Sequence, residues 1–314
     1  MTLFTAIPLE TDRAAWLKQR QLGIGGSDVA PILGLSKWRT PLDVYNDKTS
    51  DKLDDTDNTS MEWGRRLEPV IRQKYADVTG HAVIQPTDMF QNEIHPFMVA
   101  NVDGIRDDGV LVEIKTARSG ADWGEEGTDQ IPEYYLTQVQ HYMAVLGADR
   151  CDVAVLIGGS DFRIYTVERD EEIIEMLIDE ERKFWYLVEA RTPPAPRTAD
   201  EVASAFAVGK KENKEADDDI ADALVTMLRI QAQIKSLKEE EDAIKTAITG
   251  YMGEADTLTF QGTTLATWKN VKPRVTFDSA SFKKAMPDIY ERYLKQGEST
   301  RRFVIKQKLE DIEE

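Results

Sequence analysis

The stretch 97–116 constrains the possible folds more than any other part of the sequence. Two apolar segments, 97–102 and 110–116, flank a short turn region that contains the dipeptide Asp-Gly. This arrangement is a strong signal for an antiparallel β-hairpin. Because successive side chains of a strand point to opposite faces, the second strand should present Leu111, Glu113 and Lys115 on one face and Val112 and Ile114 on the other.

Glu113 and Lys115 are charged residues on what otherwise reads as a buried, central strand. Burial of a charge is costly unless the charge is paired or bound to a metal ion. The hairpin would bring Asp103 next to Glu113, and a divalent cation would relieve the repulsion between the two carboxylates. The alternative interpretation is that both charged side chains face solvent on a half-exposed strand.

These three residues suit the hydrolysis of a phosphodiester bond. Carboxylates and water molecules are the ligands that Mg²⁺ and Mn²⁺ prefer. Such a cation lowers the pKa of a bound water molecule and stabilises charge on the phosphoryl oxygens. Lys115 would orient the attacking water or neutralise charge on the phosphate. The pattern therefore predicts that Asp103, Glu113 and Lys115 form the centre of a metal-dependent nuclease.

Two residues on expected helices extend this centre. Glu68, on a helix expected over 61–79, is positioned in the sequence to supply a third carboxylate, although a lone helical glutamate is usually a surface residue. Gln138, on a helix expected over 132–146, is predicted to hydrogen-bond the attacking water or a phosphate.

A glycine-rich turn, Gly25-Gly26-Ser27, opens another short helix. The backbone N–H groups at the start of a helix, together with a hydroxyl group, form a natural site for a phosphate. Turns of this kind also serve as ordinary helix N-caps. The turn alone therefore leaves both interpretations open.

The order of the expected elements indicates the fold class. Helices come first, then antiparallel strands, then a helix, two more strands and a further amphipathic helix. This order predicts an α/β protein with a restriction-endonuclease-like mixed β-sheet core flanked by helices. The expected helices cover 11–22, 37–48, 61–79, 132–146 and 170–190, and the expected strands cover 82–85, 88–91, 97–102, 110–116, 151–157 and 162–167.

The proline-rich segment 192–196 is typical of a linker. It divides the chain into an expected nuclease domain, 1–197, and an appended module, 198–314. In that module the sequence predicts a long helix over 215–252, a β-hairpin over 256–277 and a final helix over 279–294. The long helix is expected to be either an arm of a helical hairpin or a short coiled-coil element.

The charge distribution qualifies what the net charge of −18 implies about partners. An acidic protein is a poor match for nucleic acid, because phosphate contacts need Lys and Arg. The acidic excess is concentrated in 1–197, however, whereas 269–308 contains 11 basic and four acidic residues. A cation bound between carboxylates also reverses the local sign of the potential, so that an acidic cleft can hold phosphate.

Other features exclude several classes of protein. Cys151 is the single cysteine, which excludes an intrachain disulfide, and the three histidines do not have zinc-site spacing. The sequence contains no apolar run of about 20 residues, the length that crosses a membrane. The first residues also lack a signal-peptide pattern, so we expect a soluble, cytoplasmic protein.

In order along the chain, these segments resemble the lambda-exonuclease-like, or YqaJ-type, phage recombination nucleases of the PD-(D/E)XK superfamily. The resemblance covers about residues 13–190. Each motif is weak alone, but the ordered set is specific. The set consists of Trp16 with Arg20, Gly23-Ile24-Gly25-Gly26-Ser27, Trp63-Gly64 with Glu68, Asp103-Gly104, Glu113-Ile114-Lys115, and Tyr135 with Gln138-Val139-Gln140.

The resemblance implies a role for each matched residue. Asp103 and Glu113, with the carbonyl of Ile114, resemble the metal ligands, and Glu68 resembles a carboxylate near a second metal ion. Lys115 resembles the catalytic lysine, and Gln138 a glutamine beside the active centre. Arg20 and Ser27 match positions that hold a terminal 5′-phosphate; Asn101 stands where the family has a serine in that pocket. Val102 replaces the proline that precedes the first aspartate in the superfamily.

The implied activity is Mg²⁺-dependent 5′→3′ digestion of double-stranded DNA ends, with Mn²⁺ as an alternative and two ions in the site. It would leave 3′ single strands for a phage single-strand annealing protein. The resemblance also implies a ring-shaped homotrimer in a bacterial cell, encoded by a phage or prophage. Two alternatives stay open: a structure-specific or sequence-specific endonuclease of the same fold, and a non-catalytic DNA-end-binding protein.

Overall fold

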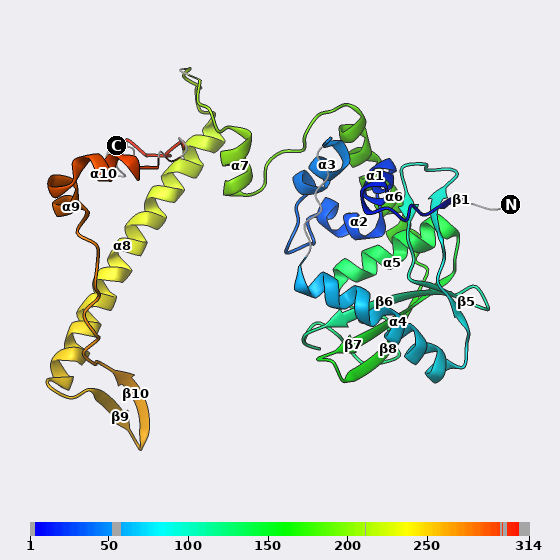
Figure 1. Cartoon of the computed structure of the whole chain (residues 1–314), viewed down its shortest axis with the longest axis horizontal. Helices are drawn as coiled ribbons and strands as arrows, with labels where there is room; N and C mark the ends of the chain where they lie inside the picture. The colour runs from blue at the N-terminus through cyan, green and yellow to red at the C-terminus, as the bar shows by residue number, and fades with distance from the viewer. Residues whose placement is uncertain (1–3, 52–57, 211, 296, 298–299, 308–314) are drawn as a thin grey trace. The chain divides into compact units, whose positions relative to one another are not determined.

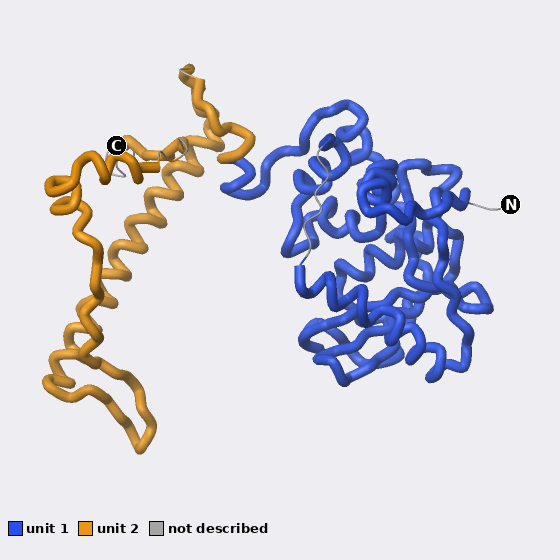
Figure 2. Tube along the Cα trace, viewed as in Figure 1, with its two compact units in different colours: residues 1–202 blue, residues 203–314 orange. Residues whose placement is uncertain are grey.

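The protein is an α/β protein in which a mixed β-sheet is flanked by helices, as the sequence predicts (Figure 1). The computed structural model describes residues 4–51, 58–210, 212–295, 297 and 300–307. Its chain divides into two compact units, residues 1–202 and 203–314 (Figure 2). Among the described residues, no helix combines the length and apolar character that a membrane-spanning helix requires.

The first unit contains eight named strands and most of the helices. Its strands are β1 (Phe4–Pro8), β2 (Val83–Ile84), β3 (Asp88–Asn92), β4 (Val99–Ala100), β5 (Gly104–Arg106), β6 (Leu111–Ala117), β7 (Arg150–Ile157) and β8 (Asp161–Glu168). Its helices are α1 (Arg13–Gln19), the 3-10 turn η1 (Arg20–Leu22), α2 (Gly26–Leu33), α3 (Pro41–Thr49), α4 (Thr59–Thr79), α5 (Glu133–Leu146) and α6 (Glu171–Glu189), and α7 (Ala199–Ala205) spans the boundary between the units.

The main sheet has the strand order β2-β5-β6-β7-β8. A hairpin is present, but its first strand is not the expected 97–102: β5 and β6 pair antiparallel, with Gly104 opposite Val112 and Ile105 opposite Leu111, whereas β4 pairs with β3 in the other sheet. β6 and β7 are parallel, and α5 forms the connection between them. β7 and β8 pair antiparallel, so the sheet is mixed. This order makes β6, with its two charged residues, the central strand.

The alternation of side chains on β6 decides which helix meets the charged residues. Val112 and Ile114 pack with Ile71 and Tyr75 of α4 on one face. Leu111 packs on the other face, in the core cluster that contains several residues of α5. Since Glu113 and Lys115 have the same parity as Leu111, they face α5 rather than α4.

A buried polar network fixes α4 to the sheet. Arg106 of β5 donates to Asp152 of β7 at 3.0 Å and to the hydroxyl of Tyr75 at 3.3 Å, and Tyr75 donates to Asp152. All three side chains are buried. Since Glu68 and Tyr75 are two helical turns apart on one face of α4, anchoring Tyr75 also holds Glu68 above the sheet.

A second layer covers α5. Strands β1, β3 and β4 form a separate small sheet, and α2, α3 and α6 share a core with Val29, Tyr45 and Phe184. Gly26 at the start of α2 touches α5 so closely that an added Cβ would lie 2.5 Å from a ring carbon of Tyr142. Close packing of α2 against α5 therefore requires glycine at this position, whether or not the turn binds a phosphate.

The second unit contains one long helix and several short elements. The expected helix over 215–252 is present as a single continuous helix, α8 (Asp218–Met252). It is followed by β9 (Thr257–Phe260) and β10 (Thr263–Thr267), which form the expected hairpin. Nearly all described side chains of this unit are exposed, with Met252 the buried exception.

The expected final helix over 279–294 is wrong as a single element. The structure has two short helices, α9 (Ser279–Ala285) and α10 (Pro287–Arg292), which are separated at Met286. Met286 has φ −139° and ψ 64°, outside the helical region. The residue before a proline is disfavoured in the helical conformation, and Pro287 has no N–H to continue the ladder. The expected strand 97–102 is likewise shorter and is confined to β4.

Candidate active site

Glu113, Lys115 and Gln138 form a closed hydrogen-bonded group between β6 and α5. Lys115 donates to Oε1 of Glu113 and, at 3.1 Å, to Oε1 of Gln138. The amide of Gln138 in turn donates to Oε1 of Glu113 at 2.7 Å and contacts the hydroxyl of Tyr142 at 2.9 Å. Lys115 also lies over the ring of Tyr135, 4.6 Å from its centroid. The solvent-facing alternative for the two charged residues is therefore wrong, since Glu113 is only 2% exposed.

Asp103 joins this group from the loop between β4 and β5. Its Oδ2 accepts the backbone N–H of Ile114 at 2.9 Å. Asp103 is also close enough for its negative charge to act on Glu113. The structure thus brings Asp103, Glu113 and Lys115 together, as the hairpin pattern predicts.

The two carboxylates are electrostatically strained. Burial is the largest effect on Glu113, and together with the negative charge of Asp103 it raises the pKa of Glu113 above its usual range. Burial likewise raises the pKa of Asp103, although Lys115 and the N–H of Ile114 oppose the shift. Burial opposes the charge of Lys115 too, but the two carboxylates raise the pKa of that amine. Added positive charge would stabilise both carboxylates in their ionised form.

The donor atoms fit a divalent cation that prefers oxygen. The Oε2 of Glu113 is buried and has no hydrogen-bond partner among the described residues. An unsatisfied, buried carboxylate oxygen next to a second carboxylate is what a bound cation would satisfy. The side chain of Ile114 packs on the opposite face with α4, so only its backbone can contribute to this site.

Glu68 lies close to this group but is already paired. Arg72, one turn later on α4, forms an ion pair with Glu68 and donates to the carbonyl of Asp103 at 3.1 Å. Burial and then the charge of Asp103 raise the pKa of Glu68, against the effect of Arg72. The three carboxylates do not form one compact ligand set: among the described residues, the group whose ligand atoms lie within 4.8 Å of one another is a different one.

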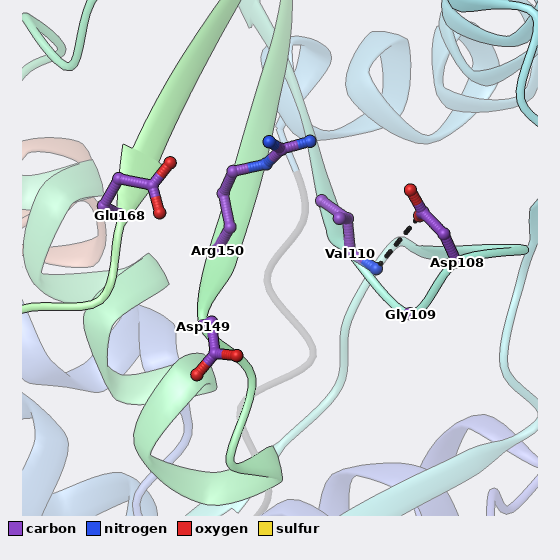
Figure 3. Close-up of a pocket in the computed structure, with 6 residues that line it drawn as sticks. All are labelled: Asp108, Gly109, Val110, Asp149, Arg150 and Glu168. Carbon is purple, nitrogen blue, oxygen red and sulfur yellow. Dashed lines mark hydrogen bonds between the residues drawn. The ribbon is translucent and has the colours of Figure 1, made fainter.

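That other group consists of His81, Asp107 and Asp108 at the turn of the β5–β6 hairpin. Its members are already engaged, since His81 contacts Asp107 at 2.8 Å and Asp108 pairs with Arg106. Both aspartates are exposed. A shallow cavity of about 300 Å³ opens nearby, at the opposite end of β6 from Lys115 (Figure 3). Neither feature includes a residue of the Glu113 group.

Four charged side chains, which we call the cation cluster, meet at the start of α2: Asp28, Lys48, Arg39 and Arg20. Asp28 is buried, and its carboxylate lies 2.7 Å from the amine of Lys48, 3.3 Å from Arg39 and 4.0 Å from Arg20. Arg20 also donates to the hydroxyl of Ser27 at 3.3 Å. Burial by itself would raise the pKa of Asp28, but the charges of Lys48, Arg20 and Arg39 together hold it well below its usual value.

This cluster has an excess of positive charge at a helix N-terminus. Three cations face two carboxylates, because Arg39 also pairs with Asp47, and the side chains of Arg20 and Arg39 keep about a third of their surface exposed. The guanidinium of Arg20 is stacked on Trp16, 5.0 Å from the ring centroid. A fixed, partly exposed pair of guanidinium groups at the N-terminus of a helix is suited to an anion.

Tyr142 connects the two clusters. Its ring contacts Gly26, the residue before Ser27, and its hydroxyl contacts Gln138. The charges of Glu113, Asp103 and Arg20 all act on the pKa of Tyr142, which burial raises well above its usual value. The carboxylate group and the cation cluster are therefore neighbours in the fold, although more than 50 residues separate them in the sequence.

Among the residues predicted to form the phosphate pocket, Asn101 has the weakest connection to the others. Its Oδ1 is buried and has no hydrogen-bond partner among the described residues, and no contact joins it to Arg20 or Ser27. Conversely, Arg39, Lys48 and Asp28 belong to the cation cluster but were not expected from the sequence. The available signal in the sequence was Asp28, directly after the glycine-rich turn. A buried aspartate needs a paired cation, so Asp28 could have indicated basic residues close to it in the fold.

Comparisons with known proteins identify the class. The YqaJ-like viral recombinase domain matches residues 15–149, a range that contains both clusters. The protein YqaJ of Bacillus subtilis (strain 168) is 32% identical over 310 residues, which is 95% of each chain. The chain therefore belongs to the YqaJ family, which confirms the resemblance seen in the sequence.

Two solved structures are also similar. The alkaline exonuclease LHK-Exo from Laribacter hongkongensis is 22% identical, with a TM-score of 0.49, and the match covers 57% of this chain and 93% of that one. A phage-related exonuclease from Haemophilus somnus 129PT is 16% identical, with a TM-score of 0.41, and the match covers 54% and 96% of the two chains.

Proposed function

We propose that this protein is a Mg²⁺-dependent exonuclease that digests double-stranded DNA from its 5′ ends and leaves 3′ single strands for phage-type recombination. The observation that supports this most is the half-buried Asp103 next to the buried Glu113 and beside Lys115, with Oε2 of Glu113 unpartnered among the described residues. In this proposal these residues act as the ligand and charge set of a PD-(D/E)XK nuclease.

In this proposal Asp103, Glu113 and the carbonyl of Ile114 hold the cation. When bound, the cation would supply a hydroxide-like water and stabilise charge on the scissile phosphate. Lys115 is held by Glu113 and Gln138, so its amine is fixed where it can orient the nucleophile or stabilise the developing charge. Glu68 would take part in a second ion site only after it exchanges its pairing with Arg72.

The cation cluster supports the preference for ends. Arg20 and Ser27, with Arg39 beside them, would hold a terminal 5′-phosphate at the N-terminus of α2. Tyr142 contacts both this cluster and the group around Glu113. A 5′-phosphate held by the cluster would therefore bring the first phosphodiester bond close to the carboxylates that would hold the metal. A sequence-specific endonuclease has no need of such a pocket.

Digestion of linear duplexes tests the activity directly. Duplexes labelled at either strand end, with and without 5′-phosphate, are incubated in Mg²⁺, and closed circular DNA is the control. We expect loss of the 5′-terminal strand, faster with 5′-phosphate, and intact circles. Cleavage of the circles would favour the endonuclease alternative, and no cleavage of any DNA would favour the end-binding alternative.

Lys115→Met should reduce turnover about 100-fold, because one fixed donor near a developing charge is worth about that much. Binding of the same DNA in Ca²⁺ should change little, since the amine acts mainly in the transition state. Single-turnover rates test the expected loss of turnover, and fluorescence anisotropy tests the expected retention of binding. A parallel loss of binding would instead assign Lys115 to substrate positioning.

Arg20→Ala should reduce the preference for 5′-phosphorylated ends by about tenfold, because it removes a charge-assisted contact to the terminal phosphate. The ratio of digestion rates on phosphorylated and hydroxyl ends is the measurement. Lys18→Ala is the matched control, because it removes an exposed cation from the same helical region. If both variants keep the wild-type ratio, Arg20 does not belong to the pocket.

We also propose a ring-shaped homotrimer and a phage single-strand annealing protein as partner, both from the family resemblance. Light scattering of the purified chain gives the subunit number. A mass of one or two chains would contradict the ring.

A further inference from the structure

The basic segment, residues 268–306 of the second unit, has a composition unlike the rest of the chain. Its described residues include ten basic and three acidic residues, in a protein of net charge −18. The ten are Lys269, Lys272, Arg274, Lys283, Lys284, Arg292, Lys295, Arg301, Arg302 and Lys306. All ten are exposed.

These cations are not used to hold the unit together. Within the described part of the chain, no ion pair involves any of them; the structure gives only a carbonyl contact for Arg301 and a ring contact for Lys283. Asp278, one of the three acidic residues, is occupied as the N-cap of α9. The segment therefore presents uncompensated positive charge to a partner.

Exposed aromatic residues alternate with these cations. Trp268 is 53% exposed and Phe277 72%, and they flank Lys269, Lys272 and Arg274 in a stretch without helix or strand. Further along, Tyr293 and Phe303 are 80% and 72% exposed. Exposed aromatic rings next to cations offer faces on which unpaired bases can stack.

We infer that the basic segment binds single-stranded DNA, with its cations on the phosphates and its aromatic rings on the bases. The argument for a single strand over a duplex is chemical: base faces are free to stack on aromatic side chains only when the strand is unpaired. The inference deepens the proposed function, since the 3′ strand left by digestion is such a ligand. The nuclease unit would then cut one strand while the appended unit holds the other.

The test measures binding without catalysis. Anisotropy of a labelled, 5′-hydroxyl oligo-dT is recorded with the full-length protein in EDTA over a range of salt concentrations, and a hairpin-capped duplex of equal length is the comparison. The 5′-hydroxyl removes the ligand of the proposed phosphate pocket. EDTA removes the metal, so failure of the proposed nuclease activity would leave this measurement intact.

The triple variant Lys269→Gln, Lys272→Gln, Arg274→Gln should weaken binding to the single strand more than tenfold at low salt. The slope of log affinity against log salt should become shallower by about 2, which corresponds to three lost phosphate contacts. Trp268→Ala should weaken single-strand binding at least about fivefold, through loss of stacking on a base. Binding to the capped duplex should change less in both variants.

Matched controls separate local contacts from net charge. Lys235→Gln, Lys238→Gln, Lys245→Gln removes the same charge from exposed positions of α8, and Tyr251→Ala removes an exposed ring from its end. Both controls should bind as the wild type does. Equal loss in the control triple variant, or unchanged affinity in the test variants, would overturn the inference. A change of subunit number without a change in DNA affinity would instead indicate that the segment contacts an acidic surface of another chain.

Discussion

Glu113→Gln is expected to lower the rate of Mg²⁺-dependent digestion by at least about 1000-fold, which corresponds to about 4 kcal/mol of the activation barrier. Glutamine keeps the shape and the Oε1 acceptor but removes the negative charge that would hold the cation. Asp103→Asn should have the same effect, because both carboxylates contribute to one site. Initial rates of nucleotide release from a linear 5′-phosphorylated duplex are the measurement.

The same substitution should leave the fold intact. Burial raises the pKa of both Glu113 and Asp103, and the charge of Asp103 adds to the shift of Glu113, so the ionised pair is destabilised when no cation is present. Neutralising one of them should keep or slightly raise the melting temperature measured without metal. A large fall in stability would mean that the lost activity reflects unfolding.

Asp107→Asn is the matched control for the metal assignment. It changes the partly exposed group His81, Asp107 and Asp108, where potential ligands gather among the described residues. We expect near wild-type digestion. Inactive Asp107→Asn together with active Glu113→Gln would transfer the metal site to the hairpin turn and contradict the proposal.

The second large effect concerns stability. Asp28→Asn should lower the free energy of unfolding by about 3–5 kcal/mol, because removal of one member of a buried ion pair leaves the other charge unpaired. Lys48 is the residue left behind, with a side chain only 4% exposed. The N–H of Gly25 also loses an ionised acceptor at the start of α2. Urea unfolding at pH 7 gives the difference.

The pH dependence follows from the sign of the shift. Since the pKa of Asp28 is lower in the folded protein, its contribution is complete above the unfolded value of about 3.9 and is lost as pH falls toward the folded value. The difference between wild type and Asp28→Asn should therefore stay constant from pH 8 to about pH 5 and shrink only below about pH 4. A difference that already shrinks near pH 6 would contradict the depressed pKa.

Two further variants make this prediction specific. Asp47→Asn removes another carboxylate that pairs with Arg39, but that carboxylate is 48% exposed, so we expect a loss below about 1 kcal/mol. Adding Lys48→Met to Asp28→Asn should recover part of the lost stability, because no unpaired buried amine remains. No recovery would mean that Lys48 is not the cause.

The sequence by itself determined that β6 belongs to a hairpin and which face of β6 carries the charged residues, but not that the first strand of the hairpin is β5. Asp-Gly between two apolar segments specifies a turn by local backbone preference, and the two-residue period of a strand puts Glu113 and Lys115 on one face. Both are local properties, so they can be predicted without knowledge of the rest of the fold. For the same reason most helices and strands were predicted, while the break at Met286 was missed although Pro287 was visible.

The tertiary structure alone decided how distant segments meet. The sequence could suggest Glu68 as a ligand, but only the packing of α4 shows it paired with Arg72. Arg39 and Lys48 are ordinary surface residues in the sequence and become part of a buried cluster because α3 packs beside α2 around Asp28. Burial and charge pairing depend on contacts between segments that no local pattern encodes. The charged face of β6 could therefore be predicted from 20 residues of sequence. The cation cluster could be recognised only in the folded chain.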